Sequence, residues 1–310
     1  MPGDEFVSWS NAAAFPLIPD PVSAEIMRQM ARSPRFDAAG PNWEFRPIQG
    51  DMNQTTDRGV MQIDDKGSDG RIPIVTGGSF NLWNPDAGSP FAYARPSVLR
   101  PHLASKLARA VRSSRSAYNG LKFTEGLLPM DSARIAFRDI ARATDSRTMI
   151  CCLLPPGVAA VHKAPLVVRR RGTAGVEAAL LGIMSSVPFD WITRRWVELT
   201  MSFELLNAFP VPRPGNTPVG RRLIEVAGRL SAVDDRYADW ALEVNVPVGS
   251  VKSRAEKDDL IAELDALVSL LYGLTDDQVE HVFATFHRGW NYGPRLEAVL
   301  QHYQTWKGKA

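Results

Sequence analysis

Hydrophobic and polar positions are most clearly ordered between residues 134 and 156, RIAFRDIARATDSRTMICCLLPP. In the first part, Ile135 and Phe137 alternate with smaller or charged residues, which is the period of a half-buried strand. The second part is continuously apolar and stops at two prolines and a glycine, as is typical of a strand covered on both faces. Asp and Ser between the two parts favour a turn. The pattern predicts a β-hairpin, a rigid platform that carries Arg138, Arg142 and Arg147 at or near its polar end.

The remaining pattern predicts strands in the first two thirds of the chain and helices throughout the last third. Apolar positions that recur every three to four residues indicate helices, and short alternating or apolar runs bounded by Gly or Pro indicate strands. We expect helices at residues 22–31, 99–118 and 177–191, strands at 43–47, 72–80 and 166–168, an extended proline-rich run at 205–214, and helices at 219–232, 255–271, 275–286 and 295–306. This order predicts a mixed α/β (α+β) domain at residues 35–214, with an irregular and helical lead-in at 1–34 and an α-helical module at 215–310.

Length and composition indicate a globular protein with a sizeable core, since 45% of the 310 residues are hydrophobic and 23% are charged. No run approaches the roughly 18 apolar residues of a membrane span, and the acidic start, MPGDEFVSW, does not resemble a signal peptide. Adjacent Cys151 and Cys152 lie in the apolar run, where small buried side chains are expected rather than a disulfide. We therefore expect a cytoplasmic protein that has no membrane partner.

Charge is distributed unevenly, although the net charge is only +2. Residues 95–171 contain fifteen Lys or Arg and four acidic residues, a net of +11, whereas residues 221–310 contain eleven and fourteen, a net of −3. A basic middle beside a slightly acidic end suggests a nucleic-acid surface in the middle of the chain. Scattered, solvated arginines are the alternative explanation of the same count.

Seven basic residues are candidates for contacts with DNA phosphates. Three of them recur every third residue along the helix expected at 99–118, where they either follow a phosphate backbone or form a solvated face. Three adjacent arginines follow the strand expected at 166–168, and we expect them in the loop that ends it. The candidates are Lys106, Arg109, Arg112, Lys163, Arg169, Arg170 and Arg171.

A second set of residues has the side-chain chemistry that reads base edges. The segment 49–58, QGDMNQTTDR, combines amides, hydroxyls and a guanidinium, and such groups pair with adenine and guanine in the major groove. An ordinary polar loop has the same composition, and hairpin arginines such as Arg138 could instead be structural, paired with Asp139 or Asp145. The base-reading candidates are Asn53, Gln54, Thr55, Thr56, Arg58, Arg142 and Arg147.

No catalytic or metal-binding motif is found in the sequence. The five histidines have no metal-ligand spacing, and neither CxxC nor HExxH occurs. A nucleophile made of Cys151 or Cys152 with His162 is disfavoured, because an apolar strand opposes thiolate formation. We therefore predict no catalytic residue and no metal ligand in this chain.

Four stretches resemble, in order and spacing, the C-terminal target-recognition region of the Eco57I-like and TaqI-like N6-adenine DNA methyltransferases, the fused restriction–modification enzymes of type IIG. They are residues 134–156, LLGIMSSVPFDW at 180–191, FPVPRP at 209–214 and AELDALVSLLYGL at 262–274, with residues 49–58 a plausible fifth. The resemblance implies a protein that recognises a short sequence in double-stranded DNA and positions an adenine for methylation, in restriction–modification or phage defence.

The catalytic half of that family is missing from the sequence. The family grips the flipped adenine with an Asn/Asp-Pro-Pro-aromatic motif. Here Asn84, Pro85 and Asp86 lack the second proline and the aromatic residue, and no Gly-rich loop for S-adenosylmethionine follows a strand. The resemblance therefore implies the non-catalytic, DNA-binding part of an adenine-specific, site-specific DNA methyltransferase, either as a piece of a longer enzyme or as a separate subunit. S-adenosylmethionine would be bound by the associated methyltransferase domain or subunit, and this chain would hold no cofactor.

A different class of function stays open on the sequence alone. The basic face could bind a partner protein, which would make the chain a non-catalytic interaction scaffold of a defence complex. Dependence of DNA binding on salt distinguishes the two, because phosphate contacts release counterions.

Overall fold

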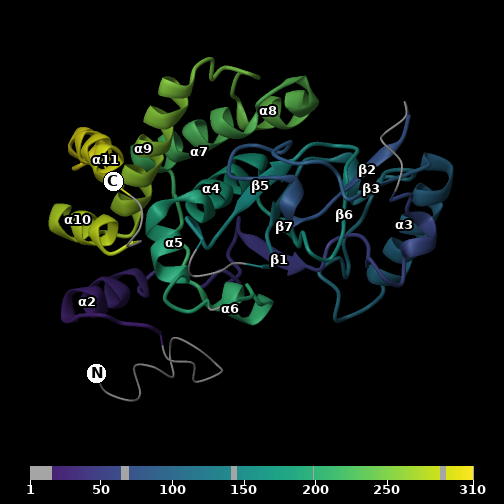
Figure 1. Ribbon diagram of the computed structural model, residues 1–310, viewed down its shortest axis with the longest axis horizontal. Coiled ribbons are helices and arrows are strands. Elements are labelled where there is room, and N and C mark those ends of the chain that lie inside the picture. The colour runs from purple at the N-terminus through teal and green to yellow at the C-terminus, as the bar shows by residue number, and fades with distance from the viewer. Residues whose placement is uncertain (1–15, 64–69, 141–144, 198, 287–290, 310) are drawn as a thin grey trace. The chain divides into compact units, whose positions relative to one another are not determined.

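The computed structural model describes residues 16–63, 70–140, 145–197, 199–286 and 291–309 (Figure 1). The chain forms two compact units that interleave in sequence. The helical unit consists of Met1–Ala38, Ala141–Ile150 and Thr173–Ala310, and the sheet unit consists of Ala39–Ile140 and Cys151–Gly172. These bounds differ from the continuous ranges 35–214 and 215–310 expected from the sequence, because residues 173–214 belong with the helices that follow them.

Within its described residues the sheet unit contains two β-sheets, and together with the helices they confirm the mixed α+β class. The larger sheet is antiparallel in the order β1-β7-β4-β5, and in the smaller one, of order β3-β2-β6, β3 is antiparallel and β6 parallel to β2. The strands are β1 (Glu44–Ile48), β2 (Ile72–Val75), β3 (Ala92–Ala94), β4 (Arg134–Phe137), β5 (Cys151–Leu154), β6 (Ala159–Ala160) and β7 (Leu166–Arg171). Every residue of β4 and β5 is buried, as the hydrophobic pattern of the predicted hairpin requires.

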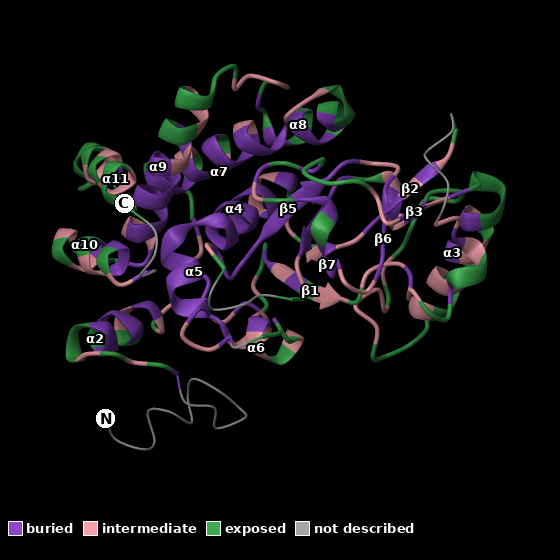
Figure 2. Ribbon diagram, viewed as in Figure 1, coloured by how far each residue is buried: buried purple, intermediate pink, exposed green. Residues whose placement is uncertain are grey.

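Helix α3 (Pro96–Ala110) packs on the smaller sheet of this unit. Leu99 and Leu103 are buried in one cluster with Ile72 and Ile74 of β2 and with Met130. The other sides of α3 are half-buried or exposed, and Figure 2 shows this mixed burial along the helix. Short 3-10 helices connect elements of this unit: η1 (Arg58–Val60), η2 (Gly77–Ser79) and η3 (Pro129–Asp131).

Helix α9 (Arg254–Leu271) is central to the helical unit, since it packs against α7 (Pro218–Ser231) and α11 (Gly293–Trp306). Helix α4 (Ala174–Ser185) packs on α7 in turn. The remaining elements are α2 (Pro21–Met30), α5 (Val187–Thr193), α6 (Phe203–Ala208), η4 (Asp235–Tyr237), α8 (Ala238–Val244) and α10 (Asp276–Ala284). Among the described residues, no helix is both long enough and apolar enough to cross a membrane.

Three elements have boundaries that differ from those predicted from the sequence. The helix expected at 99–118 ends at Ala110, and the chain then folds back so that the N–H of Gly120 donates to the carbonyl of Val111 at 3.1 Å. Gly120 has a φ of +71°, which glycine adopts without strain. The helix expected at 177–191 is two helices, because Ser186 ends α4 and caps α5. The arginine triplet at 169–171 belongs to strand β7 and not to the loop after it.

Candidate nucleic-acid interface

The 53–58 loop is tied to helix α3 by the carboxylate of Asp57. One oxygen accepts hydrogen bonds from the N–H of Asn53 at 2.7 Å and from Nζ of Lys106 at 2.8 Å. The other lies 3.0 Å from Nε2 of His102. We call this set of four residues the Asp57 junction. It brings together two groups of candidates that are about fifty positions apart in sequence.

Asp57 is ionised at neutral pH. Burial of the carboxyl on its own would raise its pKa, but the hydrogen bonds and charge of Lys106, the N–H of Asn53 and the hydrogen bond with His102 together hold the pKa of Asp57 below its usual value. The carboxylate therefore keeps its charge-assisted hydrogen bonds at neutral pH.

A buried ion pair fixes the chain just before the loop. Arg134, at the start of β4, donates through Nη1 and Nη2 to the two carboxylate oxygens of Asp51, at 2.7 and 2.9 Å. Nη2 also donates to the carbonyl of Val158 at 2.8 Å, and Asp51 accepts the N–H of Ala160 at 2.9 Å. A buried pair of this kind is tolerated when further hydrogen bonds satisfy both partners, as they do here.

The loop itself has a defined shape. Oδ1 of Asn53 accepts the N–H groups of Thr55 and Thr56, at 2.9 and 3.2 Å. The side chains of Thr55, Thr56 and Arg58 are exposed, whereas Asn53 and Gln54 are half-buried. The Asn53 side-chain oxygen is thus used to form the turn, and the exposed hydroxyls and guanidinium remain accessible.

Lys106, Arg109 and Arg112 differ in how far their charge is already compensated. Lys106 is half-buried and paired with Asp57. Arg109 is exposed and donates only to the carbonyl of Ser105, at 3.3 Å. Arg112, like Arg58, is exposed and forms no ion pair with the residues that the structure describes. Arg109 and Arg112 are therefore available for phosphate, and Lys106 mainly positions the loop.

The arginine triplet separates into structural and accessible members. Arg170, 21% exposed, donates to Glu44 at 2.9 Å and to the carbonyls of Ala117 and Asn119, and so fastens the segment after α3 to the sheet. Arg171 is 53% exposed and donates to the carbonyl of Gly40 at 3.0 Å. Arg169 is half-buried and reaches the carbonyl of Gly172. Arg171 is the most exposed of the three.

Two further candidates are compensated or buried. Nζ of Lys163 lies 2.6 Å from the carboxylate of Asp139. Arg147 lies in the helical unit, only 7% exposed. Its Nε donates to the buried carboxylate of Asp190, and its Nη2 donates to the carbonyls of Ser185 and Ser186. The assignment of Arg147 as a base reader is therefore corrected, because its guanidinium is the counter-ion of a buried acid. Arg142 lies outside the described residues.

The described part of the chain contains no group of three or more His, Cys, Asp or Glu side chains that could hold a metal ion. Cys151 and Cys152 are buried free thiols. In the glycine pair after β2, a Cβ added to Gly77 would come within 2.9 Å of the carbonyl oxygen of Lys163, whereas a Cβ added to Gly78 would meet open space.

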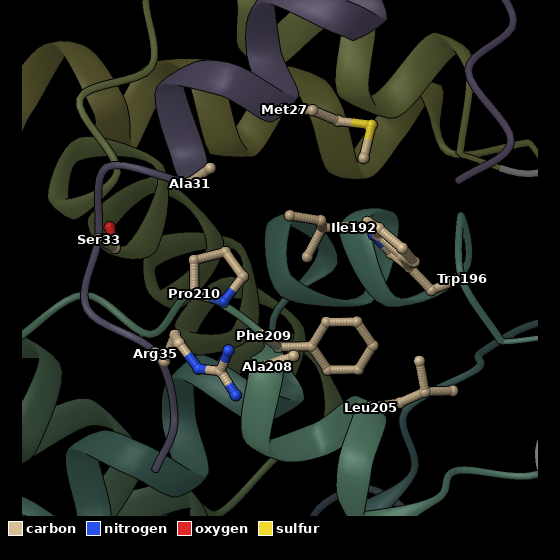
Figure 3. A pocket seen from close by; sticks show the side chains of 10 residues that line it. All are labelled: Met27, Ala31, Ser33, Arg35, Ile192, Trp196, Leu205, Ala208, Phe209 and Pro210. Atoms are coloured by element: carbon tan, nitrogen blue, oxygen red, sulfur yellow. The ribbon is translucent and has the colours of Figure 1, made fainter. Parts of the chain in front are cut away.

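A small pocket in the helical unit is apolar (Figure 3). Met27 of α2, Ile192, Trp196 and Phe209 line it, and Ser33 and Arg35 are its polar members. Its volume of about 60 Å³ is well below the roughly 300 Å³ at which ligand sites begin. It therefore offers neither the room nor the groups for catalysis on a nucleotide.

The comparisons with known proteins add no family. No protein-family model matches the chain, and a search of curated proteins gives no match. The function must therefore be inferred from this chain's own residues and geometry.

Proposed function

We propose that the sheet unit binds double-stranded DNA and reads a short sequence, as the target-recognition part of an N6-adenine DNA methyltransferase of a restriction–modification or phage-defence system. The observation that carries the proposal is the Asp57 junction. It joins a loop that has base-reading chemistry to a helix that has exposed arginines. Proteins that recognise DNA need both kinds of group in a fixed relation, because phosphate contacts set the register and base contacts supply the specificity.

The exposure of each side chain supports a different role for it in this proposal. Thr55, Thr56 and Arg58 are exposed on a loop that is held at both ends, which suits hydrogen bonds to base edges. Arg109, Arg112 and Arg171 are exposed and would contact phosphates. The 53–58 loop would then lie over the bases while α3 follows the backbone.

Methyl transfer itself would be performed elsewhere. The chain would act in the cytoplasm with a methyltransferase domain or subunit that binds S-adenosylmethionine and the target adenine. The role of this chain would be to hold the duplex and to select the site. A methylase that carries the Asn/Asp-Pro-Pro-aromatic motif, encoded beside this protein, would be the expected partner.

Binding to duplex DNA as a function of salt tests the proposal. Fluorescence anisotropy with a labelled random-sequence duplex, between about 50 and 200 mM salt, should give a linear log–log dependence with a slope of about −0.9 for each phosphate contacted. Changing Arg109 and Arg112 together to Ala should flatten the slope by about 2. Arg254→Ala is the matched control, because Arg254 is 94% exposed on α9 of the other unit.

Two results would reject the proposal. The first is an absence of binding at the lowest salt. The second is an equal loss of binding in the Arg254 control and in the double variant, which would indicate only a general charge effect.

A further inference from the structure

The two exposed sides of helix α3, on either side of its buried face, differ in chemistry. At 100° per residue, His102, Lys106 and Arg109 lie on the flank that meets the 53–58 loop. Ala104 and Ala108 lie on the opposite flank, beside an open groove of about 470 Å³. The junction with Asp57 uses only the first flank. The second flank is therefore not explained by the proposed DNA contacts.

The groove is apolar on both walls. The wall made by α3 and the residue after it consists of Ala104, Ala108 and Val111, and Leu121, Phe123 and Leu127 form the facing wall. Phe123 is 37% and Leu127 53% exposed, although both are large apolar side chains. Exposed apolar side chains gathered along one groove mark an interaction site more often than isolated ones do.

Contacts at both ends keep the groove open. At one end Arg100 of α3 donates to both carboxylate oxygens of Asp131, each at 2.7 Å, and to the carbonyl of Gly126 at 3.0 Å. The hydrogen bonds with Asp131 raise the pKa of Arg100, and they lower that of Asp131. At the other end the N–H of Gly120 donates to the carbonyl of Val111. The two walls are thus fixed relative to each other before any partner binds.

Three basic residues that are close in sequence to lining residues, which we call the rim, carry positive charge. Arg112 and Arg115 follow the lining residue Val111, and Lys122 lies between two other lining residues. All three are exposed and form no ion pair with the residues that the structure describes. Residues 95–131 contain seven Lys or Arg and two acidic residues. Asp131 is already bound by Arg100, and Glu125 is exposed between the lining residues Phe123 and Gly126, so the basic residues remain in excess. An occupant with acidic flanks would complement this rim.

We infer that the α3 groove, lined by the six residues named above, binds an acidic amphipathic helix of a partner protein. Its apolar anchors would lie between α3 and residues 121–127, and its Asp or Glu side chains would pair with Arg112, Arg115 and Lys122. A helix fits this groove because Ala104 and Ala108, one turn apart, let another helix approach α3 closely. The inference does not depend on DNA binding, and Arg112 is the residue that the two proposals share.

Selection from a displayed library tests this inference on the full chain. The library consists of helical peptides about four turns long, with randomised apolar and polar faces. Enriched peptides should carry large apolar residues spaced i, i+3 or i+4, and i+7, flanked by Asp or Glu. Replacing their acids by lysines should weaken binding by at least about tenfold, since interfacial charge pairs couple strongly.

Two neighbouring residues of α3 give a matched pair of variants. Ala104→Gln places a longer neutral side chain in the groove, and Ser105→Gln places the same side chain on the adjacent exposed position outside it. Binding of the selected peptide should fall by about tenfold or more in the first and stay within about twofold in the second. Ala108→Gln repeats the test if the first variant unfolds.

Three outcomes would overturn the inference. The selection could enrich no acidic amphipathic sequence. The selected peptide could bind the Ala104→Gln and Ala108→Gln variants as well as it binds the natural chain. The lysine-substituted peptide could bind equally well, which would remove the role of the rim.

Discussion

Nζ of Lys106 and a carboxylate oxygen of Asp57 lie 2.8 Å apart, although 49 positions separate the two residues in the chain. This pair joins a polar loop to a basic helix and makes the two a single surface. Lys106 thereby serves the candidate interface chiefly by holding the loop, because its charge is shared with Asp57.

Asp57→Asn should loosen the junction. The amide keeps the shape but loses the charge-assisted bond from Lys106, so we expect a loss of about 1–3 kcal/mol in the free energy of unfolding at neutral pH. Asp258→Asn, at a position 66% exposed on α9, should have almost no effect. Urea titration with tryptophan fluorescence measures both. Equal stability of the two variants would contradict the role given to Asp57.

The stabilisation by Asp57 should also depend on pH. Because the pKa of Asp57 is lowered in the folded chain, its contribution is fully present above the usual value of about 3.8 and is lost as the pH falls through the folded-state pKa. The stability difference between the natural chain and Asp57→Asn should therefore be constant from neutral pH to about pH 5 and shrink below pH 4. A stability difference that grows as the pH falls would contradict a lowered pKa of Asp57 in the folded chain.

Arg147→Ala should destabilise the helical unit. It leaves the carboxylate of Asp190 buried without its counter-ion, which costs about 3–5 kcal/mol. The double change Arg147→Met and Asp190→Leu should recover much of this loss, since no uncompensated charge remains. Calorimetric unfolding compares the variants, with Arg254→Ala as the exposed control. Unchanged stability of Arg147→Ala would instead support a surface role.

Substitution of Arg170 should affect stability, and substitution of Arg171 should affect DNA binding. Arg170→Ala removes the bonds to Glu44, Ala117 and Asn119 and should lower the free energy of unfolding by about 1–3 kcal/mol. Arg171→Ala should leave unfolding nearly unchanged and flatten the salt slope of DNA binding by about 0.9. A loss of stability in Arg171→Ala and a flatter salt slope in Arg170→Ala would contradict these assignments.

Arg58 and Arg112 should differ in what they recognise. After the preferred sequence has been selected from random duplexes, Arg58→Ala should relax preference at one base pair, by about 1–3 kcal/mol. Arg112→Ala should weaken binding to all sequences alike. Anisotropy titrations with the selected duplex and single-base variants of it would measure both. A uniform loss for Arg58→Ala would make it a phosphate contact.

Local patterns in the sequence predicted most of the elements. The alternating and continuous apolar runs predicted the hairpin of β4 and β5, and the helix expected at 275–286 contains α10. Such signals depend on neighbours within one or two turns, so one sequence is sufficient to read them. The element α8 was missed, because its seven residues contain too few apolar repeats to be distinguished.

The contacts that could not be predicted from the sequence join residues that are far apart in the chain. Asp57 and His102, or Arg147 and Asp190, are 45 and 43 positions apart, and no spacing rule links residues at such distances. The arginine triplet was expected in the loop that ends the strand at 166–168. In the structure Glu44 on the paired strand β1 lies 2.9 Å from Arg170 and 3.6 Å from Arg171, and it precedes Arg170 by 126 positions.

The interleaving of the two units has a consequence for dissecting the protein. The chain passes from one unit to the other four times, after residues 38, 140, 150 and 172. No single truncation therefore releases either unit intact, and a clone of residues 35–214 would sever the helices of 173–214 from the α7 and α9 core on which α4 packs. Replacing the sheet unit would require grafting two segments, 39–140 and 151–172, together. Point substitution of exposed loop residues is the simpler way to engineer this scaffold.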